Sequence, residues 1–291
     1  MANSFIGTGV AIVTPFSNGE IDYDSLRDVV DHVVNGGVNY IVALGSTGEA
    51  ATISETESRK VLDAVIEQTN GKVPIVAGNF GSNNTRALVD KIKSYNFKGI
   101  AAILSASPSY SKPSQQGIEE HYTAVADASP VPVILYNVPG RTASNMAVQT
   151  TVNLALHQNI IGIKEASGDL DQAKSILRNV SNDFFVTSGD DVLAPAIIQS
   201  GGVGVISVLA NAYPKEFSEM ILNYIKGNIK EGRRLEDQLY PFHDCMYAEG
   251  NPSGVKAAME VLGVCSADVR LPLTRISPEL TRKLVTLVKS I

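Results

Sequence analysis

The sequence predicts an α/β protein, a (β/α)8 TIM barrel with a C-terminal helical extension. Eight short apolar runs alternate with segments of helical periodicity, which is the pattern of parallel strands joined by right-handed crossovers. The first run is followed by Thr14-Pro15-Phe16, whereas the competing open sheet would normally carry a glycine-rich dinucleotide turn there. We therefore expect residues 1–225 to form the barrel and residues 226–291 the extension.

The predicted strands are short and aliphatic, as strands buried on both faces are. They are expected at 10–13, 40–44, 74–77, 99–104, 131–136, the start of 160–167, 184–187 and 203–208. Residues 25–35 have apolar residues at helical spacing and stop at Gly36-Gly37, and Ser54 and Glu57 match a capping box that opens a helix running to Asn70-Gly71. Further helices are expected at 87–95, 115–128, from Pro214 onward, and at 233–247, 254–262 and 278–290.

Composition and charge exclude several classes of function. Of the 291 residues, 44% are hydrophobic and the net charge is -6 without a run of basic residues, so a nucleic-acid partner is not expected. No apolar stretch could span a bilayer, and residues 1–16 lack the basic lead of a signal peptide, so we expect a cytoplasmic protein. Cys245 and Cys265 lack CxxC spacing and are expected to be reduced thiols.

One stretch, residues 160–167, combines a strand signal with a reactive group. Lys164 stands at the carboxyl end of its apolar run, where ligands bind in α/β proteins. A lysine among aliphatic neighbours loses hydration, which disfavours its ammonium form and leaves an amine able to attack a carbonyl and form a Schiff base. The alternative is a rim lysine that reaches water or pairs with Glu165.

In a barrel, the loops after the strands share one rim, so residues far apart in sequence converge there. After the second strand, Ser46 and Thr47 lie between glycines, which favours a cradle for a carboxylate; a tight turn is the alternative. After the fifth strand, Tyr136 can donate and accept a proton, and Arg141 offers two donors to a carboxylate. A barrel-filling aromatic and a solvated charge are the alternatives.

Two more loops carry signals. Tyr110 stands among small polar residues, which suggests a contact with another subunit, with packing over the barrel mouth as the alternative. Asp190 and Asp191 occupy a rim position where many barrels bind phosphate, so they argue against a phosphorylated substrate. No metal is expected, because the four histidines fall on predicted helices and no pair has ligand spacing. These histidines are His32, His121, His157 and His243.

Six motifs in combination are specific to one family. They are residues 45–49, 136–139, 141–142, 162–165, 188–191 and 204–208. Together they resemble the dihydrodipicolinate synthase/N-acetylneuraminate lyase family, and the match runs from Gly7 to Pro272. The resemblance implies a (β/α)8 barrel, a homotetramer built from tight dimers, and a lyase that needs no cofactor.

The resemblance also implies the reaction and the residues. Lys164 would form a Schiff base with pyruvate, and the product would condense with L-aspartate semialdehyde on the route to diaminopimelate and lysine. Tyr136, Ser46 and Tyr110 would relay protons, with Tyr110 reaching into the neighbouring subunit. The implied substrate-binding residues are Thr47 for the pyruvate carboxylate, Ile206 and Gly189 beside it, and Arg141 for the carboxylate of the semialdehyde.

Within the family, Arg141 favours the synthase branch, because neuraminate lyases and keto-deoxy-sugar aldolases generally lack arginine there. A sugar-acid aldolase and a non-catalytic pyruvate-binding relative are the alternatives. Ser46 replaces a more frequent threonine and keeps the hydroxyl with more rotamer freedom. Feedback by lysine is expected to be weak or absent, since most groups that would hold lysine are missing. The matching positions are Ala50, Glu55, Ser58, Ala87 and Ser109.

Overall fold

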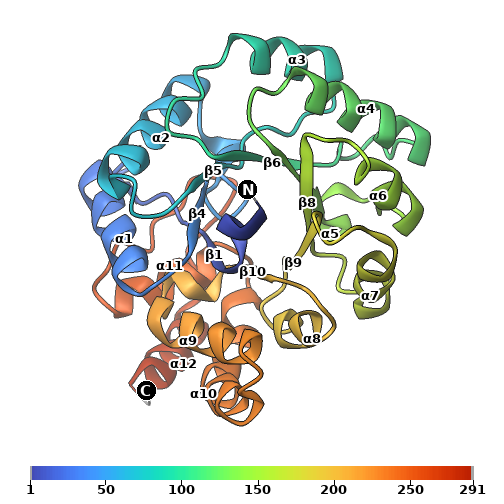
Figure 1. The fold of residues 1–291 in the computed structure, drawn as a ribbon. Coiled ribbons are helices and arrows are strands. Elements are labelled where there is room, and N and C mark those ends of the chain that lie inside the picture. The colour runs from blue at the N-terminus through green and yellow to red at the C-terminus, as the bar shows by residue number, and fades with distance from the viewer. Residues whose placement is uncertain (1, 290–291) are drawn as a thin grey trace.

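The computed structural model describes residues 2–289. Within them, eight parallel strands close into a barrel in the order β1-β10-β9-β8-β7-β6-β5-β4, and helices surround it (Figure 1). The expected barrel is therefore confirmed. The strands are β1 (Gly7–Ala11), β4 (Tyr40–Ala43), β5 (Ile75–Ala77), β6 (Ala102–Ala106), β7 (Val133–Asn137), β8 (Ile160–Glu165), β9 (Phe185–Ser188) and β10 (Gly204–Ser207).

The outer layer consists of amphipathic helices whose apolar stripes face the strands. They are α1 (Tyr23–Asn35), α2 (Glu55–Thr69), α3 (Thr85–Ser94), α4 (Gln115–Ala128), α6 (Val148–Leu154), α7 (Leu170–Asn179), α8 (Ala194–Gln199) and α9 (Pro214–Ile225). The predicted capping box is present at the start of α2, where Ser54 and Glu57 bond to each other's backbone N–H groups. The same helix ends at Asn70 in the left-handed conformation, with a φ of 48°.

Large and small side chains alternate inside the barrel. Tyr40 and Phe185 are buried there, and the neighbouring strands carry glycine where those rings lie. A Cβ on Gly9 would lie 2.2 Å from Tyr40 Cζ, and one on Gly162 would lie 2.6 Å from the ring of Phe185. Glycine at both positions is therefore required by the packing.

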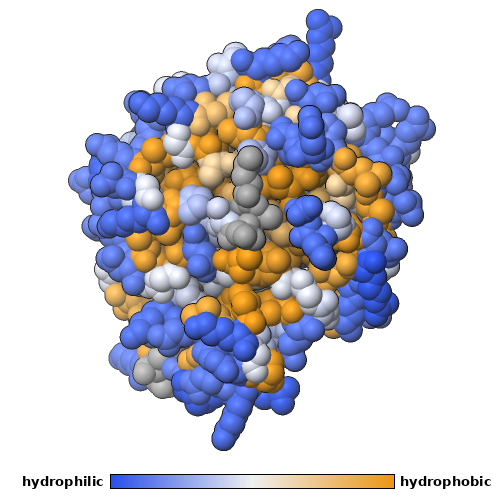
Figure 2. Space-filling view, in the orientation of Figure 1, coloured by the Kyte–Doolittle hydropathy of each residue, from blue (hydrophilic) through white to orange (hydrophobic). Residues whose placement is uncertain are grey.

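The amino-terminal end of the barrel is closed by η1 (Ala2–Phe5), which lies over the centre in Figure 1. The ring of Phe5 packs against Tyr40 and Phe185, with centroids 5.3 and 5.7 Å away. Figure 2 shows this face, with hydrophilic residues over the outer helices and hydrophobic ones around the centre. A ligand site is therefore expected at the opposite end of the barrel, where the carboxyl ends of the strands lie.

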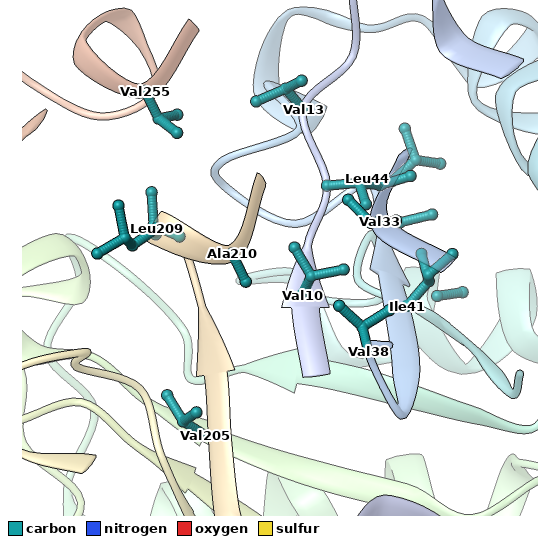
Figure 3. Packing of buried hydrophobic residues seen from close by; sticks show 14 of the residues in the cluster. Val10, Val13, Val33, Val38, Ile41, Leu44, Val205, Leu209, Ala210 and Val255 are labelled. Carbon is teal, nitrogen blue, oxygen red and sulfur yellow. The ribbon is translucent and has the colours of Figure 1, made fainter. Parts of the chain in front are cut away.

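The carboxyl-terminal helices are α10 (Ile229–Tyr247), α11 (Ser253–Val261) and α12 (Pro278–Val288). Val255 of α11 belongs to the same apolar cluster as Leu209, Ala210 and the Val10–Val13 pair of the first strand region (Figure 3). The core is thus continuous between the barrel and these helices. The division at residues 225 and 226 stays a prediction about domain organisation.

The structure corrects two predictions and adds a hairpin. The first strand, β1, begins at Gly7 instead of residue 10, because its glycines gave no apolar signal. Gly7 lies against the side chain of Asn39, and Gly9 lies against the ring of Tyr40. Residues 16–21 form a hairpin, β2 (Phe16–Ser17) and β3 (Glu20–Ile21), that was not predicted although Asn18-Gly19 is a typical hairpin turn. His157 lies in a turn after α6 instead of a helix. In the last helix, Ser290 lies outside the described residues.

Candidate active site

Lys164 lies in β8 with 5% of its surface exposed, at the end of the barrel opposite η1. Its Nζ has no hydrogen-bond or ion-pair partner among residues 2–289. It lies 4.5 Å from the centroid of the Tyr136 ring, because Tyr136 and Lys164 are direct partners in the β7–β8 register. The parallel ladder thus holds the amine over the Tyr136 ring. Neither the amine nor the Tyr136 hydroxyl makes a hydrogen bond to another described residue.

Lys164 does not pair with Glu165, which was one of the alternatives considered for this lysine. Successive residues of a strand point to opposite faces, so Glu165 points away from Lys164. Its carboxylate accepts bonds from Asn137 Nδ2 at 3.0 and 3.2 Å, from Ser167 N at 2.7 Å and from Gln172 Nε2 at 3.2 Å. Glu165 therefore braces the loop behind the strand.

Gly189 follows β9 and packs directly on the lysine. A Cβ at this position would lie 3.0 Å from Lys164 Cε and 2.5 Å from the Cβ of Ala166. The amide of Gly189 donates to the carbonyl of Glu165 at 2.7 Å, which fixes this close approach. Any larger residue would displace the lysine side chain from its place.

The loop of residues 45–49 follows β4 and carries Ser46 and Thr47 to the same cavity as Lys164. Two features force the loop to turn tightly. Leu44 has a φ of 58°, and a Cβ on Gly78 would lie 2.8 Å from the amide N of Gly45. Thr47 is 2% exposed, and its Oγ1 accepts a bond from Asn251 Nδ2 at 3.0 Å.

Arg141 lies in the short helix α5 (Pro139–Thr142), which begins directly after β7. Its side chain is exposed, and it lines two neighbouring cavities that also share Ser46 and Tyr136. The first, of about 520 Å³, contains Lys164; the second, of about 680 Å³, extends over β5 and β6. Arg141 has no ion-pair partner among the described residues, so it is available to an anion at the mouth.

The two acids after β9 have different environments. Asp190 lines the cavity, but Asp191 is 3% exposed and accepts bonds from the amides of Val208 at 3.1 Å and Leu209 at 2.8 Å. Burial raises the pKa of the Asp191 carboxyl, and the neighbouring His243 opposes that rise. Asp191 is thus committed to the loop after β10, and Asp190 alone faces a ligand.

Two of the predicted residues do not line the lysine cavity. Ile206 is wholly buried in β10, two positions before Val208, which does line it. Tyr110 is 91% exposed and borders neither cavity, and its backbone has a φ of 65° while its amide donates to the carbonyl of Thr142 at 3.0 Å. An exposed tyrosine held in this unusual conformation is consistent with the expected contact to another subunit.

The extension supplies cavity residues that the sequence reasoning missed. They are His243, Asp244, Tyr247, Ala248 and Asn251. His243 was expected to be a surface or satisfied structural histidine. It lines the cavity instead, and its Nδ1 is buried without a partner among the described residues. No sequence signal pointed to these residues, because the extension was read as helices with no place relative to the rim. Among residues 2–289, no group of three or more His, Cys, Asp or Glu side chains is placed to hold a metal ion.

Comparison with known proteins decides the family. The model of the dihydrodipicolinate synthetase family matches residues 4–291. The chain belongs to this family. A member from Cytophaga hutchinsonii named 4-hydroxy-tetrahydrodipicolinate synthase is 46% identical over 97% of this chain and 95% of its own. The enzyme of the same name from Flavobacterium psychrophilum is 45% identical over 99% of both chains.

A solved structure of the family agrees with the fold. The dihydrodipicolinate synthase from Acinetobacter baumannii, described as chloride inhibited and complexed with pyruvate, superposes with a TM-score of 0.93 at 37% identity, over 98% of this chain and 99% of its own. The family recognised from the six motifs is therefore confirmed. Cys245 and Cys265 are both free and buried. Among the described residues, no helix is long and apolar enough to cross a membrane.

Proposed function

We propose that this chain is a lyase that condenses pyruvate with L-aspartate 4-semialdehyde, the reaction of a 4-hydroxy-tetrahydrodipicolinate synthase in diaminopimelate and lysine biosynthesis. One observation carries the proposal: Lys164 is 5% exposed and lines a cavity, and its amine has no hydrogen-bond or ion-pair partner among the described residues. The names of the relatives support the same reaction. We place the enzyme in the cytoplasm.

The reaction begins when the amine of Lys164 attacks the keto carbon of pyruvate. Loss of one water gives an iminium, which withdraws electrons and acidifies the pyruvate methyl group. The enamine formed by loss of a methyl proton attacks the aldehyde carbon of the second substrate. Attack of that substrate's amine on the iminium carbon closes a ring and returns the free amine of Lys164.

These steps need a proton carrier beside the amine. Tyr136, whose ring lies 4.5 Å from Lys164 Nζ, brings a hydroxyl group to the amine from the directly paired position of β7. Ser46 lines the same cavity and extends the relay, and Tyr110 completes it from a neighbouring subunit. Hydroxyl groups can pass protons in both directions, so the relay serves the dehydration and the ring closure.

Two carboxylates have to be held in the cavity. The Thr47 hydroxyl and the backbone of Ser46 receive the carboxylate of pyruvate, and Gly189 forms the wall beside it. Ile206 lies buried behind this wall, in β10. Arg141, which is exposed at the mouth and has no ion-pair partner among residues 2–289, receives the carboxylate of the semialdehyde. The cationic guanidinium offsets the overall negative charge of the chain for two anionic substrates.

A panel of substrates tests this assignment. We expect turnover of pyruvate with aspartate semialdehyde and none, at equal enzyme concentration, for cleavage of N-acetylneuraminate or keto-deoxy-sugar acids. Arg141 is the reason, because a sugar acid presents hydroxyl groups where the semialdehyde presents a carboxylate. Faster cleavage of a sugar acid than condensation would contradict the assignment.

The oligomer is part of the proposal. Tyr110 is 91% exposed in the single chain, so its hydroxyl can act only if a second copy brings it to a site. We propose a tetramer of two tight dimers. Sedimentation should give a mass of four chains, and Tyr110→Phe should lower turnover without lowering the amount of pyruvate that Lys164 binds.

Lysine should inhibit weakly or not at all. Of the positions expected at the allosteric site, Ala50 and Ser109 line the larger cavity and offer only a methyl group and a small hydroxyl. Ser58 is 7% exposed, and Ala87 adds no polar group. A charged amino acid would find few partners there. Turnover should fall by less than about twofold in millimolar lysine, and strong inhibition would contradict this reading.

A further inference from the structure

The C-terminal extension contacts the loop that carries Ser46 and Thr47. Asn251, which follows α10 and borders the lysine cavity, donates from Nδ2 to Thr47 Oγ1 at 3.0 Å. The two residues are 204 positions apart in the chain. This bond is the one side-chain hydrogen bond that Thr47 makes among the described residues.

A second set of contacts fixes the same loop at Glu49. Lys256 of α11 donates from Nζ to Glu49 Oε1 at 2.5 Å, and the backbone N–H of Arg270 donates to Glu49 Oε2 at 3.0 Å. Both side chains of the pair are 0% exposed, and Lys256 also donates to the carbonyl of Asp268 at 2.8 Å. We call Glu49, Lys256 and Arg270 the loop anchor. It keeps the loop within reach of Asn251.

The direction of the Asn251 bond has a chemical consequence. A threonine hydroxyl has one hydrogen to donate and lone pairs to accept with. Because Asn251 donates to Oγ1, the hydroxyl hydrogen of Thr47 is not used on Asn251 and can be given to another acceptor. Thr47 is 2% exposed and borders the cavity, so an acceptor for that hydrogen is best supplied by a ligand.

We propose that Asn251 is a positioning residue, which turns the hydroxyl hydrogen of Thr47 toward the carboxylate of a bound keto acid while the loop anchor holds Thr47 in place. The inference rests on the proposed function, since it assigns that carboxylate to Thr47. It predicts that Asn251 acts on keto-acid binding through Thr47 alone.

The test measures Schiff-base formation without the second substrate. Borohydride traps the adduct on Lys164, and mass spectrometry gives the pyruvate concentration that labels half of the protein. Asn251→Ala should raise this concentration roughly tenfold, the size expected when a hydrogen bond to a charged group is lost. Asn251→Asp should raise it further, because a carboxylate accepts the Thr47 hydrogen and repels the substrate.

Matched variants at Thr47 separate the proposed route from a general effect. Asn251→Ala should have less than about a twofold effect when added to Thr47→Val, which has no hydroxyl, and should keep its roughly tenfold effect when added to Thr47→Ser, which has one. Asn223→Asp in α9 adds the same charge away from the cavity and should leave the half-labelling concentration unchanged. Thermal unfolding of each variant shows that it is folded.

The outcomes are distinct. Equal effects of Asn251→Ala in the Thr47→Val background and in the parent would overturn the inference, and so would an unchanged half-labelling concentration in Asn251→Ala or Asn251→Asp. In those cases Lys164 of the parent is still labelled, and the proposed function stands. A parent protein that pyruvate and borohydride never label would overturn both.

Discussion

Two lysines are buried in the described part of this molecule, and they lie in opposite kinds of surroundings. Lys256 is 0% exposed and Lys164 is 5% exposed, and each Nζ lies over an aromatic ring, 4.4 Å from the centroid of Phe16 and 4.5 Å from that of Tyr136. Lys256 donates to a carboxylate and a carbonyl. Lys164 has no partner among residues 2–289 and faces a cavity of about 520 Å³.

The difference shows that burial alone does not make a lysine a nucleophile. Burial lowers the pKa of Lys256, but the carboxylate of Glu49 opposes that shift by favouring the ammonium form. An ammonium group has no lone pair with which to attack a carbonyl, and Lys256 is 0% exposed. Lys164 has space for a substrate and makes no ion pair with any residue that the structure describes, so it is the lysine that can do covalent chemistry.

The largest expected effect is the loss of the nucleophile. Lys164→Arg should lower turnover by roughly a thousandfold or more, because a guanidinium cannot form a Schiff base. Steady-state kinetics with both substrates measures this. Lys60→Arg, on the exposed side of α2, is the matched control and should keep the parent rate. If Lys164→Arg catalysed the condensation at nearly the parent rate, the covalent mechanism would be contradicted.

The second effect is on stability. Lys256→Met should lower the free energy of unfolding by about 3 to 5 kcal/mol, because it leaves the Glu49 carboxylate buried without its partner. Denaturant unfolding followed by circular dichroism measures the loss. Replacing both residues, as Glu49→Gln with Lys256→Met, should cost less than the single change. A single variant as stable as the parent would show that the pair contributes nothing to the loop anchor.

A third effect concerns the mouth of the cavity that contains Lys164. Arg141→Leu should raise the KM for aspartate semialdehyde by roughly 10- to 100-fold, since a charge-assisted pair is lost, and should change pyruvate labelling of Lys164 by less than about threefold. Arg86→Leu, on the exposed side of α3, controls for the loss of one positive charge. If the KM for aspartate semialdehyde and the pyruvate concentration needed to label Lys164 rose equally, Arg141 would be assigned to pyruvate binding as well.

The smallest expected effect is on stability and concerns Arg270 of the loop anchor, which also pairs with Glu57. The Arg270 guanidinium, 2.6 Å from Glu57, lowers the pKa of that carboxyl from 4.5 to about 2. A lowered pKa stabilises the fold above pH 4.5, and this stabilisation disappears as the pH falls toward 2. Glu57→Gln should therefore cost about 1 to 2 kcal/mol of unfolding free energy at pH 7 and progressively less below pH 4.5.

The exposed pair of Arg234 and Glu231 supplies the control. Glu231→Gln removes an ion pair of similar geometry on the surface of α10 and should leave the unfolding free energy at pH 7 nearly unchanged. If Glu57→Gln and Glu231→Gln gave the same result at every pH, the Glu57 pair would be no more than a surface contact.

Local sequence patterns predicted what depends on local structure. Lys164 and Tyr136 were predicted from apolar runs that end in polar residues, and the ladder places them as direct neighbours. Asp191 shows the limit of the same reasoning: its position on the rim was predicted correctly, but its bonds to the amides of Val208 and Leu209 depend on a loop that follows another strand. Periodicity carries no information about such pairs.

The contribution of the extension could not be predicted for the same reason. Asn251 and Thr47 are 204 positions apart, and Lys256 and Glu49 are 207 positions apart. Thr47 and Glu49 belong to a motif that the sequence analysis singled out, but Asn251 and Lys256 carry no local signal of their contacts with that motif. The start of β1 was misplaced because Gly7 packs against Asn39 and Gly9 against Tyr40, and no apolar pattern records such packing.

Of the two buried lysines, only Lys164, which lines a cavity and has no hydrogen-bond or ion-pair partner among the described residues, is expected to react with a keto acid. Treatment with pyruvate and borohydride, followed by digestion and mass spectrometry of the peptides, tests it directly. We expect an adduct on Lys164 and none on Lys256. An adduct on Lys256, or turnover by a protein in which Lys164 is never labelled, would contradict it.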